Sequence, residues 1–110
     1  MKYVQGDIVL VNFFFPTGRF KDHYCVIVSN DELQEDEDFF YVVMISSNND
    51  FQKYAYELTD EMLTKNLPKK SYVKCQLLSG FTEKDVILKH GMIKQPFLDQ
   101  IIDKTIKSIF

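Results

Sequence analysis

The chain has 110 residues, 45% of them apolar and 15% aromatic, so it is long enough for one hydrophobic core and too short for two. We therefore expect a single domain over residues 1–110. The formal net charge of −3 argues against a protein covered by basic surface, the usual mark of a nucleic-acid binder. No apolar run approaches a membrane span and the N-terminus lacks a signal-peptide pattern, so we expect a cytoplasmic protein without membrane contact.

Charge is distributed unevenly along the chain. Six of the eight residues from Asp31 to Asp38 are carboxylates, which leaves 13 basic against 10 acidic residues elsewhere. The run lacks the alternating ligands and the central glycine of a calcium loop, so no metal ion is expected there. We predict a solvated acidic loop at 31–38 and a modest basic surface on the rest of the molecule.

The first half of the chain carries three strand-like runs rich in β-branched and aromatic residues. The connection 16–22 between the first two contains turn-forming and cationic residues, which favours a long hairpin. The third run has almost no polar alternation, so it must be covered on both faces. The predicted strands are Ile8–Phe15, Tyr24–Ser29 and Phe39–Ser46.

The second half continues the strand pattern and adds short helical turns. The run Ser71–Leu78 alternates between apolar and polar residues, as a strand with one wet side does, and Ser79-Gly80 ends it. Thr59 and Thr82 each precede acidic residues and are expected to begin a helical turn. The other predicted strands are Tyr54–Leu58 and Val86–Ile93, the latter bent at Gly91.

The C-terminal segment has the pattern of an amphipathic helix. Pro96 suits the first helical position, and apolar residues recur behind it at helical spacing with charged residues opposite. The apolar face comprises Phe97, Leu98, Ile101, Ile102, Thr105, Ile106 and Ile109. The predicted fold class is mostly β, a compact barrel with short helical turns that is closed by this helix.

Two cysteines, Cys25 and Cys75, lie in strand-like segments without a partner at metal-ligand spacing. We interpret them as buried free thiols, which fits a reducing compartment.

Five segments, in this order, resemble the MazF/PemK toxins of bacterial toxin-antitoxin modules. They are Gly6–Val11, Val26–Asn30, Ile45-Ser46, Ser71–Lys74, and Gly91 followed by the terminal helix. No single segment is specific, but their order and spacing together span nearly the whole chain.

The resemblance implies an SH3-like barrel that forms a homodimer and acts as a growth-inhibiting, metal-independent endoribonuclease without a cofactor. Its substrate would be single-stranded RNA, cut to leave a 2′,3′-cyclic phosphate and a 5′-hydroxyl. Its partner would be an antitoxin polypeptide that blocks the RNA groove, and through that complex the protein would also contact DNA.

The resemblance also implies site residues. The family's threonine or serine at the end of the third strand falls on Ser46, whereas its arginine at the start of the second strand falls on His23 and the following proline on Tyr24. An acidic or amide residue falls on Gln76, and a basic residue often found further along falls near Ser79, which has no charge. The catalytic pattern is therefore altered, above all at the arginine.

The residues present still suit RNA cleavage by the 2′-hydroxyl. The ordinary pKa of histidine, about 6.5, lets His23 accept or donate a proton near neutral pH. Arg19 and Lys21 would supply positive charge to the phosphate, and Ser46 would orient the hydroxyl or bind a phosphate oxygen. The candidate catalytic residues are His23, Ser46 and Arg19, and the candidate RNA-binding residues are Lys21, Ser47, Lys74, Gln76 and Tyr72.

Alternative interpretations remain open at this stage. His23 beside Asp22 also fits a surface ion pair, and Ser46 also fits a hydroxyl that ends a strand by bonding backbone. The protein would then be a catalytically inactive family member that binds protein or nucleic acid. A third hypothesis is an interaction module that uses a sheet edge or the acidic run 31–38 for a basic partner.

Overall fold

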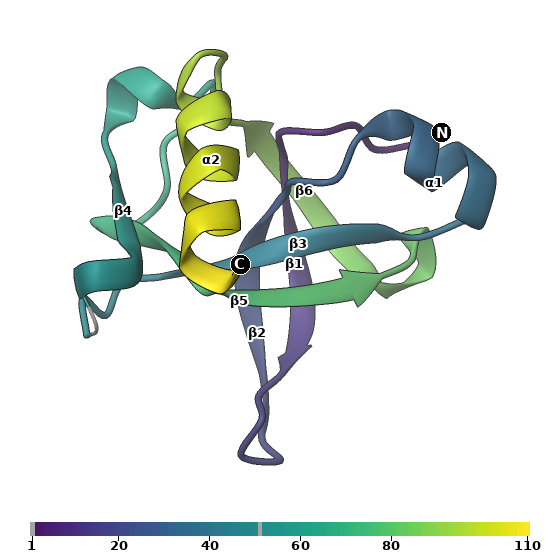
Figure 1. The fold of residues 1–110 in the computed structure, drawn as a ribbon, viewed down its shortest axis with the longest axis horizontal. Helices are drawn as coiled ribbons and strands as arrows, with labels where there is room; N and C mark the ends of the chain where they lie inside the picture. Colours follow the sequence, from purple (N-terminus) through teal and green to yellow (C-terminus); the bar gives the residue numbers. More distant parts are fainter. Residues whose placement is uncertain (1, 51) are drawn as a thin grey trace.

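A six-stranded antiparallel sheet, strongly curved, forms most of the computed structural model, which describes residues 2–50 and 52–110 (Figure 1). The strands lie in the order β4-β5-β3-β2-β1-β6. Their bounds are β1 Asp7–Phe14, β2 Phe20–Ile27, β3 Phe40–Ser46, β4 Ala55–Leu58, β5 Ser71–Phe81 and β6 Val86–Met92; the helices are α1 Asp31–Glu37 and α2 Phe97–Ile109.

The two ends of the sheet approach each other and close it into a barrel. A β-bridge joins Leu63, which follows β4, to Ile93, which follows β6. Backbone hydrogen bonds on either side of the bridge run from Thr64 to Met92 (3.1 Å) and from Lys94 to Met62 (2.8 Å). The predicted fold class, an SH3-like barrel with short helical turns and a C-terminal helix, is confirmed.

Both faces of the central strands are buried, as the apolar run of the third strand requires. On one face, Ile8, Val26 and Val43 pack with residues of α2, including Leu98 and Ile101. On the other face, a second cluster contains Val9, Val11, Phe13, Cys25, Ile27, Phe40 and Val42. Along β2 and β3 the buried side chains alternate between these clusters, because successive residues of a strand point to opposite faces.

The acidic run is a helix, so the prediction of a loop at 31–38 was wrong. The side chain of Asn30 caps α1 by accepting a hydrogen bond from the Leu33 amide (2.9 Å), and acidic residues in the first turn suit the helix dipole. Gln34 is buried and donates to the Tyr3 carbonyl, which fixes the helix to the barrel. The six carboxylates are exposed, as predicted.

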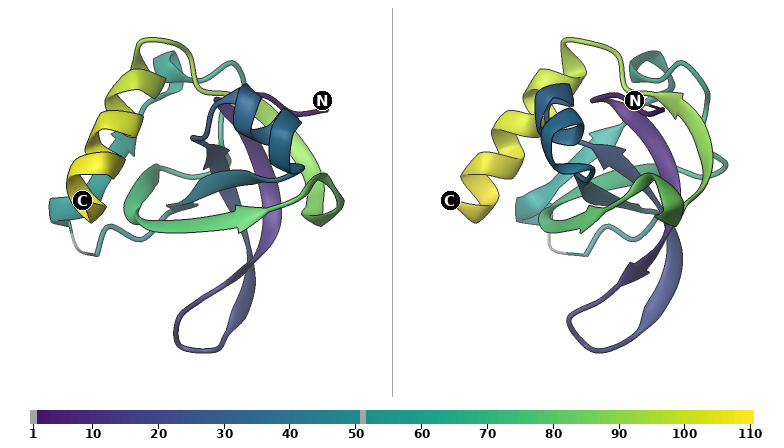
Figure 2. Two further views of the ribbon diagram at one scale, coloured as in Figure 1. Left: turned by 45° about the vertical axis from the view of Figure 1, so that its right-hand side comes forward. Right: turned by 90° about the vertical axis from the view of Figure 1, so that its right-hand side faces the viewer.

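Two strands extend beyond their predicted bounds. β2 begins at Phe20, not Tyr24, because Phe14 to Asn12 pair with Phe20 to Asp22 and carry the hairpin outward (Figure 2). β5 continues through Ser79-Gly80 to Phe81, so the predicted end at Leu78 was wrong. The reason is that Phe40, Tyr41 and Val42 of β3 pair with Phe81, Gly80 and Ser79.

The helical predictions hold with small shifts. Single 3-10 turns follow Thr59 and Thr82, and the second has the reciprocal capping box of Thr82 and Asp85. Pro96 stands immediately before α2 instead of inside it. The apolar face of α2 is only partly covered, because Leu98, Ile101 and Thr105 are buried whereas Ile106 is 53% exposed.

Cys25 and Cys75 are both buried and free, as predicted. Burial raises the pKa of each thiol, so neither is a ready nucleophile.

Candidate functional site

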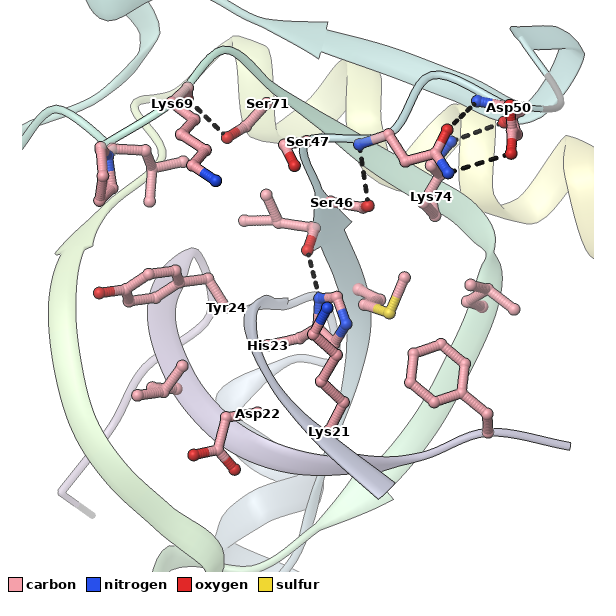
Figure 3. A pocket seen from close by; sticks show the side chains of 18 of the residues that line it. Lys21, Asp22, His23, Tyr24, Ser46, Ser47, Asp50, Lys69, Ser71 and Lys74 are labelled. Carbon is pink, nitrogen blue, oxygen red and sulfur yellow. Dashed lines mark hydrogen bonds between the residues drawn. The ribbon is translucent and has the colours of Figure 1, made fainter. Parts of the chain in front are cut away.

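A cavity of about 880 Å³ lies between the outer half of β2, the end of β3, the segment 47–50, β5 and the loop that precedes β5 (Figure 3). Seven of the eight predicted site residues line this cavity: Arg19, Lys21, His23, Ser46, Ser47, Lys74 and Gln76. Tyr72, which pairs with Ser46 on one side and with Glu57 on β4 on the other, is not among the lining residues.

His23 is held inside the cavity by the neighbouring strand. Its Nδ1 lies 3.1 Å from the carbonyl oxygen of Ile45, and because a carbonyl only accepts, Nδ1 carries the hydrogen. This tautomer leaves Nε2 with a free lone pair. The bond places the imidazole beside the residue that follows Ile45, which is Ser46 (Figure 3).

The surroundings of His23 favour its neutral form. Burial lowers the pKa of the imidazole from its ordinary value of 6.5, and the positive charge of Lys21 lowers it further. The hydrogen bond to Ile45 and the negative charge of Asp22 raise the pKa and so offset part of this shift. Asp22 itself accepts a hydrogen bond from Asn12 Nδ2 (2.9 Å). No ion pair joins it to His23 within 4.0 Å in the described part of the chain. The arrangement suits a general base better than a surface ion pair.

Ser46 is the last residue of β3 and lies where the chain turns into the segment 47–50. Its Oγ accepts a hydrogen bond from the Asn48 amide (3.1 Å), so the hydroxyl hydrogen remains for a further acceptor. Asn48 and Asp50 bond each other twice, from Asn48 Nδ2 to Asp50 Oδ2 (3.0 Å) and from the Asp50 amide to Asn48 Oδ1 (2.8 Å). These bonds fix the segment that presents the hydroxyl.

The wall opposite His23 is formed by β5. Lys74 is only 5% exposed, and its Nζ donates to the carbonyl oxygen of Asp50 (2.6 Å). Gln76 lies two residues further on the same strand, and its buried Oε1 receives no hydrogen bond within residues 2–50 and 52–110. An ammonium and an unpartnered amide oxygen therefore stand side by side on one strand face, which suits a polar ligand with both acceptors and donors.

The β1–β2 hairpin forms the outer rim of the cavity. Arg19, Phe20 and Lys21 are exposed there, and the Phe20 ring packs on Phe14 at a centroid distance of 4.7 Å. The rings of Phe15 and His23 pack in a T-shaped arrangement with their centroids 5.4 Å apart, which joins the rim to the interior.

Sequence reasoning missed several lining residues. Lys69 extends toward the cavity from the loop before β5, and Asp50 and Ser71 also line the cavity (Figure 3). The basic pair Lys69-Lys70 is a weak signal, because nothing local shows that this loop returns to the cavity. The lining carries four cations (Arg19, Lys21, Lys69 and Lys74) against two carboxylates (Asp22 and Asp50), although the whole chain is acidic.

Metal ligands do not gather in the described residues: no group of three or more histidine, cysteine or carboxylate side chains is placed to hold an ion. Within the same residues, no helix has the length and apolarity needed to cross a membrane.

The family model for the PemK-like, MazF-like toxins of type II toxin-antitoxin systems matches residues 4–110. The chain belongs to this family. The resemblance noted from short segments is thereby confirmed over almost the full length. Sequence comparison with curated proteins gave no match.

Solved structures of low sequence identity share the fold. An endoribonuclease from a mycobacterial species, in complex with its cognate antitoxin, aligns with a TM-score of 0.74 at 11% identity over 96% of this chain and 92% of that one. The toxin MazF-mt6 of Mycobacterium tuberculosis gives 0.68 at 14% identity, covering 94% and 99%. The MazE-MazF structure from Deinococcus radiodurans gives 0.73 at 10% identity and covers both chains fully.

Proposed function

We propose that this PemK/MazF-like protein is the toxin of a toxin-antitoxin module and a metal-independent endoribonuclease that cleaves single-stranded RNA in the cavity between β2, β3 and β5. The observation that carries the proposal is the convergence of His23 from β2 and Ser46 from β3 in one cavity whose charged lining is mostly cationic. An imidazole, a hydroxyl and nearby cations are the groups that RNA cleavage without a metal requires.

The proposed chemistry begins at His23. Its Nε2 accepts the proton of the ribose 2′-hydroxyl, whose oxygen attacks the adjacent phosphorus, and the imidazolium then returns a proton to the departing 5′-oxygen. The lowered pKa keeps the imidazole neutral at pH 7 and ready to accept that proton. The products are a 2′,3′-cyclic phosphate and a 5′-hydroxyl.

Ser46 and the rim complete the site. The Ser46 hydroxyl, already an acceptor for the Asn48 amide, donates to a phosphate oxygen. Arg19 and Lys21 on the exposed hairpin attract the polyanionic strand and bind flanking phosphates. Ser47 contacts the nucleotide from the segment 47–50 and Gln76 from β5, whereas Tyr72 stays outside the proposed RNA contacts because it does not line the cavity.

The proposed partners follow from the same cavity. An antitoxin polypeptide with an acidic segment would occupy it and exclude RNA. The solved structures of similar fold include an endoribonuclease in complex with its cognate antitoxin. We further propose a homodimer in the cytoplasm, with DNA contacted only through the antitoxin complex. Expression without the antitoxin would then arrest growth.

The direct test incubates the purified protein with a long single-stranded RNA and excess chelator, then determines the chemistry of both new ends. We expect cleavage with cyclic phosphate and 5′-hydroxyl termini, and loss of cleavage in His23→Ala. Intact RNA after incubation with the wild type, or equal cleavage by His23→Ala, would contradict the proposal. Bound but intact RNA would instead identify a catalytically inactive binding module.

A further inference from the structure

Lys74 combines burial, charge and position in a way that its neighbours do not. It is 5% exposed, and the Asp50 carbonyl, a neutral acceptor, is the partner of its Nζ at 2.6 Å. No carboxylate oxygen lies within 4.0 Å of this Nζ in the described ranges. Burial lowers the pKa of the ammonium from 10.5, against the opposing charge of Asp50.

Lys74 pairs with Met44, which also lines the cavity, and an irregularity in the sheet lies directly beyond this pair. Val43 pairs with Leu78, yet its neighbour Met44 pairs with Lys74, so β5 bulges between these positions. Bulges of this kind re-aim side chains and are common beside active sites. Lys74 lines the same cavity as Ser46 and His23 (Figure 3).

The other cations of the cavity are held less firmly. Arg19 and Lys21 are exposed on the hairpin, and Lys69 is exposed on a loop. A surface ammonium is strongly hydrated and must be reorganised before it meets a phosphate. A buried ammonium that is fixed on a strand acts in a less polar setting, where a charged group affects a reacting phosphate most.

We propose that Lys74 is a catalytic residue of the endoribonuclease, whose ammonium binds a non-bridging oxygen of the scissile phosphate and stabilises the phosphorane. This role rests on the proposed function. The bond from the 2′-oxygen to phosphorus forms, the bond to the 5′-oxygen breaks, and the proton passes through His23, so Lys74 keeps all its protons. It supplies the charge at phosphorus that a neutral imidazole does not.

A structural role for Lys74 predicts different behaviour. Through the Asp50 carbonyl, Lys74 also tethers the segment 47–50 that presents Ser46. Lys74→Gln keeps a donor for that carbonyl and removes the charge, whereas Lys74→Met removes both. Lys74→Arg keeps the charge. Lys84→Met, on an exposed 3-10 turn outside the cavity, is the matched control.

The experiment measures three quantities for each variant. They are the single-turnover cleavage rate at saturating protein, the affinity for the same RNA blocked by 2′-O-methyl groups, and the melting temperature. We expect Lys74→Met and Lys74→Gln to lower the rate by about 100-fold, as removal of one charge-stabilising donor does, with less than about tenfold loss of affinity. Lys74→Arg should recover part of the rate, and Lys84→Met should stay within about twofold of wild type.

Several outcomes would overturn this role. Cleavage by Lys74→Gln at the wild-type rate would show that Lys74 only tethers the segment 47–50. Equal losses of rate and affinity would make it a binding residue only. If Lys74→Met has a lower melting temperature than the wild type, the cleavage rates of Lys74→Gln and Lys74→Arg decide whether the charge of Lys74 matters. A wild type that cleaves no RNA would overturn the proposed function itself, whereas a cleaving wild type with an equally active Lys74→Gln overturns the role of Lys74 alone.

Discussion

The inner wall of the cavity and its outer rim bear similar chemical groups under very different constraints. On the wall, His23 is hydrogen-bonded to Ile45, and Lys74 is buried and bonded to the segment 47–50. On the rim, Arg19 and Lys21 are exposed at the end of a hairpin that projects from the barrel (Figure 2). The two groups of residues therefore differ in burial and in the number of contacts that hold them.

This difference implies a division of labour. Groups that stabilise a transition state must be held in place before the reaction, because reorganisation at that moment is costly. Groups that attract a polyanion work through long-range and salt-sensitive attraction, so they need charge but little order. We expect substitutions on the wall to change the rate of cleavage, and substitutions on the rim to change affinity and its dependence on salt.

The largest effect is expected for His23 on the wall. His23→Ala should lower the single-turnover cleavage rate by about 1000-fold, because a general base contributes on the order of 10² to 10⁴. Binding of a 2′-O-methylated RNA should change little. A rate within tenfold of wild type would remove the imidazole from the mechanism.

Ser46 should follow with a smaller loss. Ser46→Ala removes one hydrogen bond to a charged group, worth about 1.5 to 3 kcal/mol, so we expect the cleavage rate to fall by roughly 30-fold. Ser47→Ala removes the adjacent hydroxyl and should lower the cleavage rate by less than Ser46→Ala does. If the two variants are equally slow, the hydroxyl of Ser46 has no special position.

The pH dependence of cleavage tests the state of His23. Because burial lowers the pKa of its imidazole below 6.5, the neutral form should predominate at pH 7 and the rate should fall as the pH drops through that lowered pKa. The loss at pH 5 should be smaller than an imidazole with the ordinary pKa of 6.5 would show. Measured single-turnover rates that rise on acidification would instead make His23 a general acid.

The rim should respond in affinity. Arg19→Gln combined with Lys21→Gln should weaken binding of single-stranded RNA by about fivefold at low salt, and should reduce the slope of log affinity against log salt by about 1.4 for two phosphate contacts. The single-turnover rate at saturating protein should stay close to wild type. An unchanged salt slope, measured by titration at several salt concentrations, would place the RNA elsewhere.

The smallest effect is expected far from both regions. Neutralising Glu32, Glu35 and Asp36 on α1 should change RNA affinity by less than about twofold, since α1 does not line the cavity. The same variant tests a different hypothesis, that the acidic segment recruits a basic partner. Loss of partner binding with unchanged cleavage would support that interaction as a separate property.

Much of the architecture could be predicted from local sequence patterns. Apolar runs and turn residues located all six strands, and helical spacing located α2, since these signals depend on neighbours in the chain. The acidic run was misjudged because its repulsive charges outweighed the signal of Asn30 as a cap and of Gln34 as a buried anchor. Ser79-Gly80 suggested a strand end because local breakers do not reveal that β3 continues alongside.

By itself, the amino-acid sequence determined that a hydroxyl ends the third strand, that an imidazole stands near the start of the second, and that the chain resembles the PemK/MazF toxins. Only the tertiary structure decided which polar residues meet. The pairing of β5 with β3 sets Lys74 beside Met44 in the cavity wall, the loop of Lys69 returns to the same cavity, and Tyr72 does not line it. Such contacts join residues far apart in the chain, and they depend on register and bulges that alternating polarity alone does not specify.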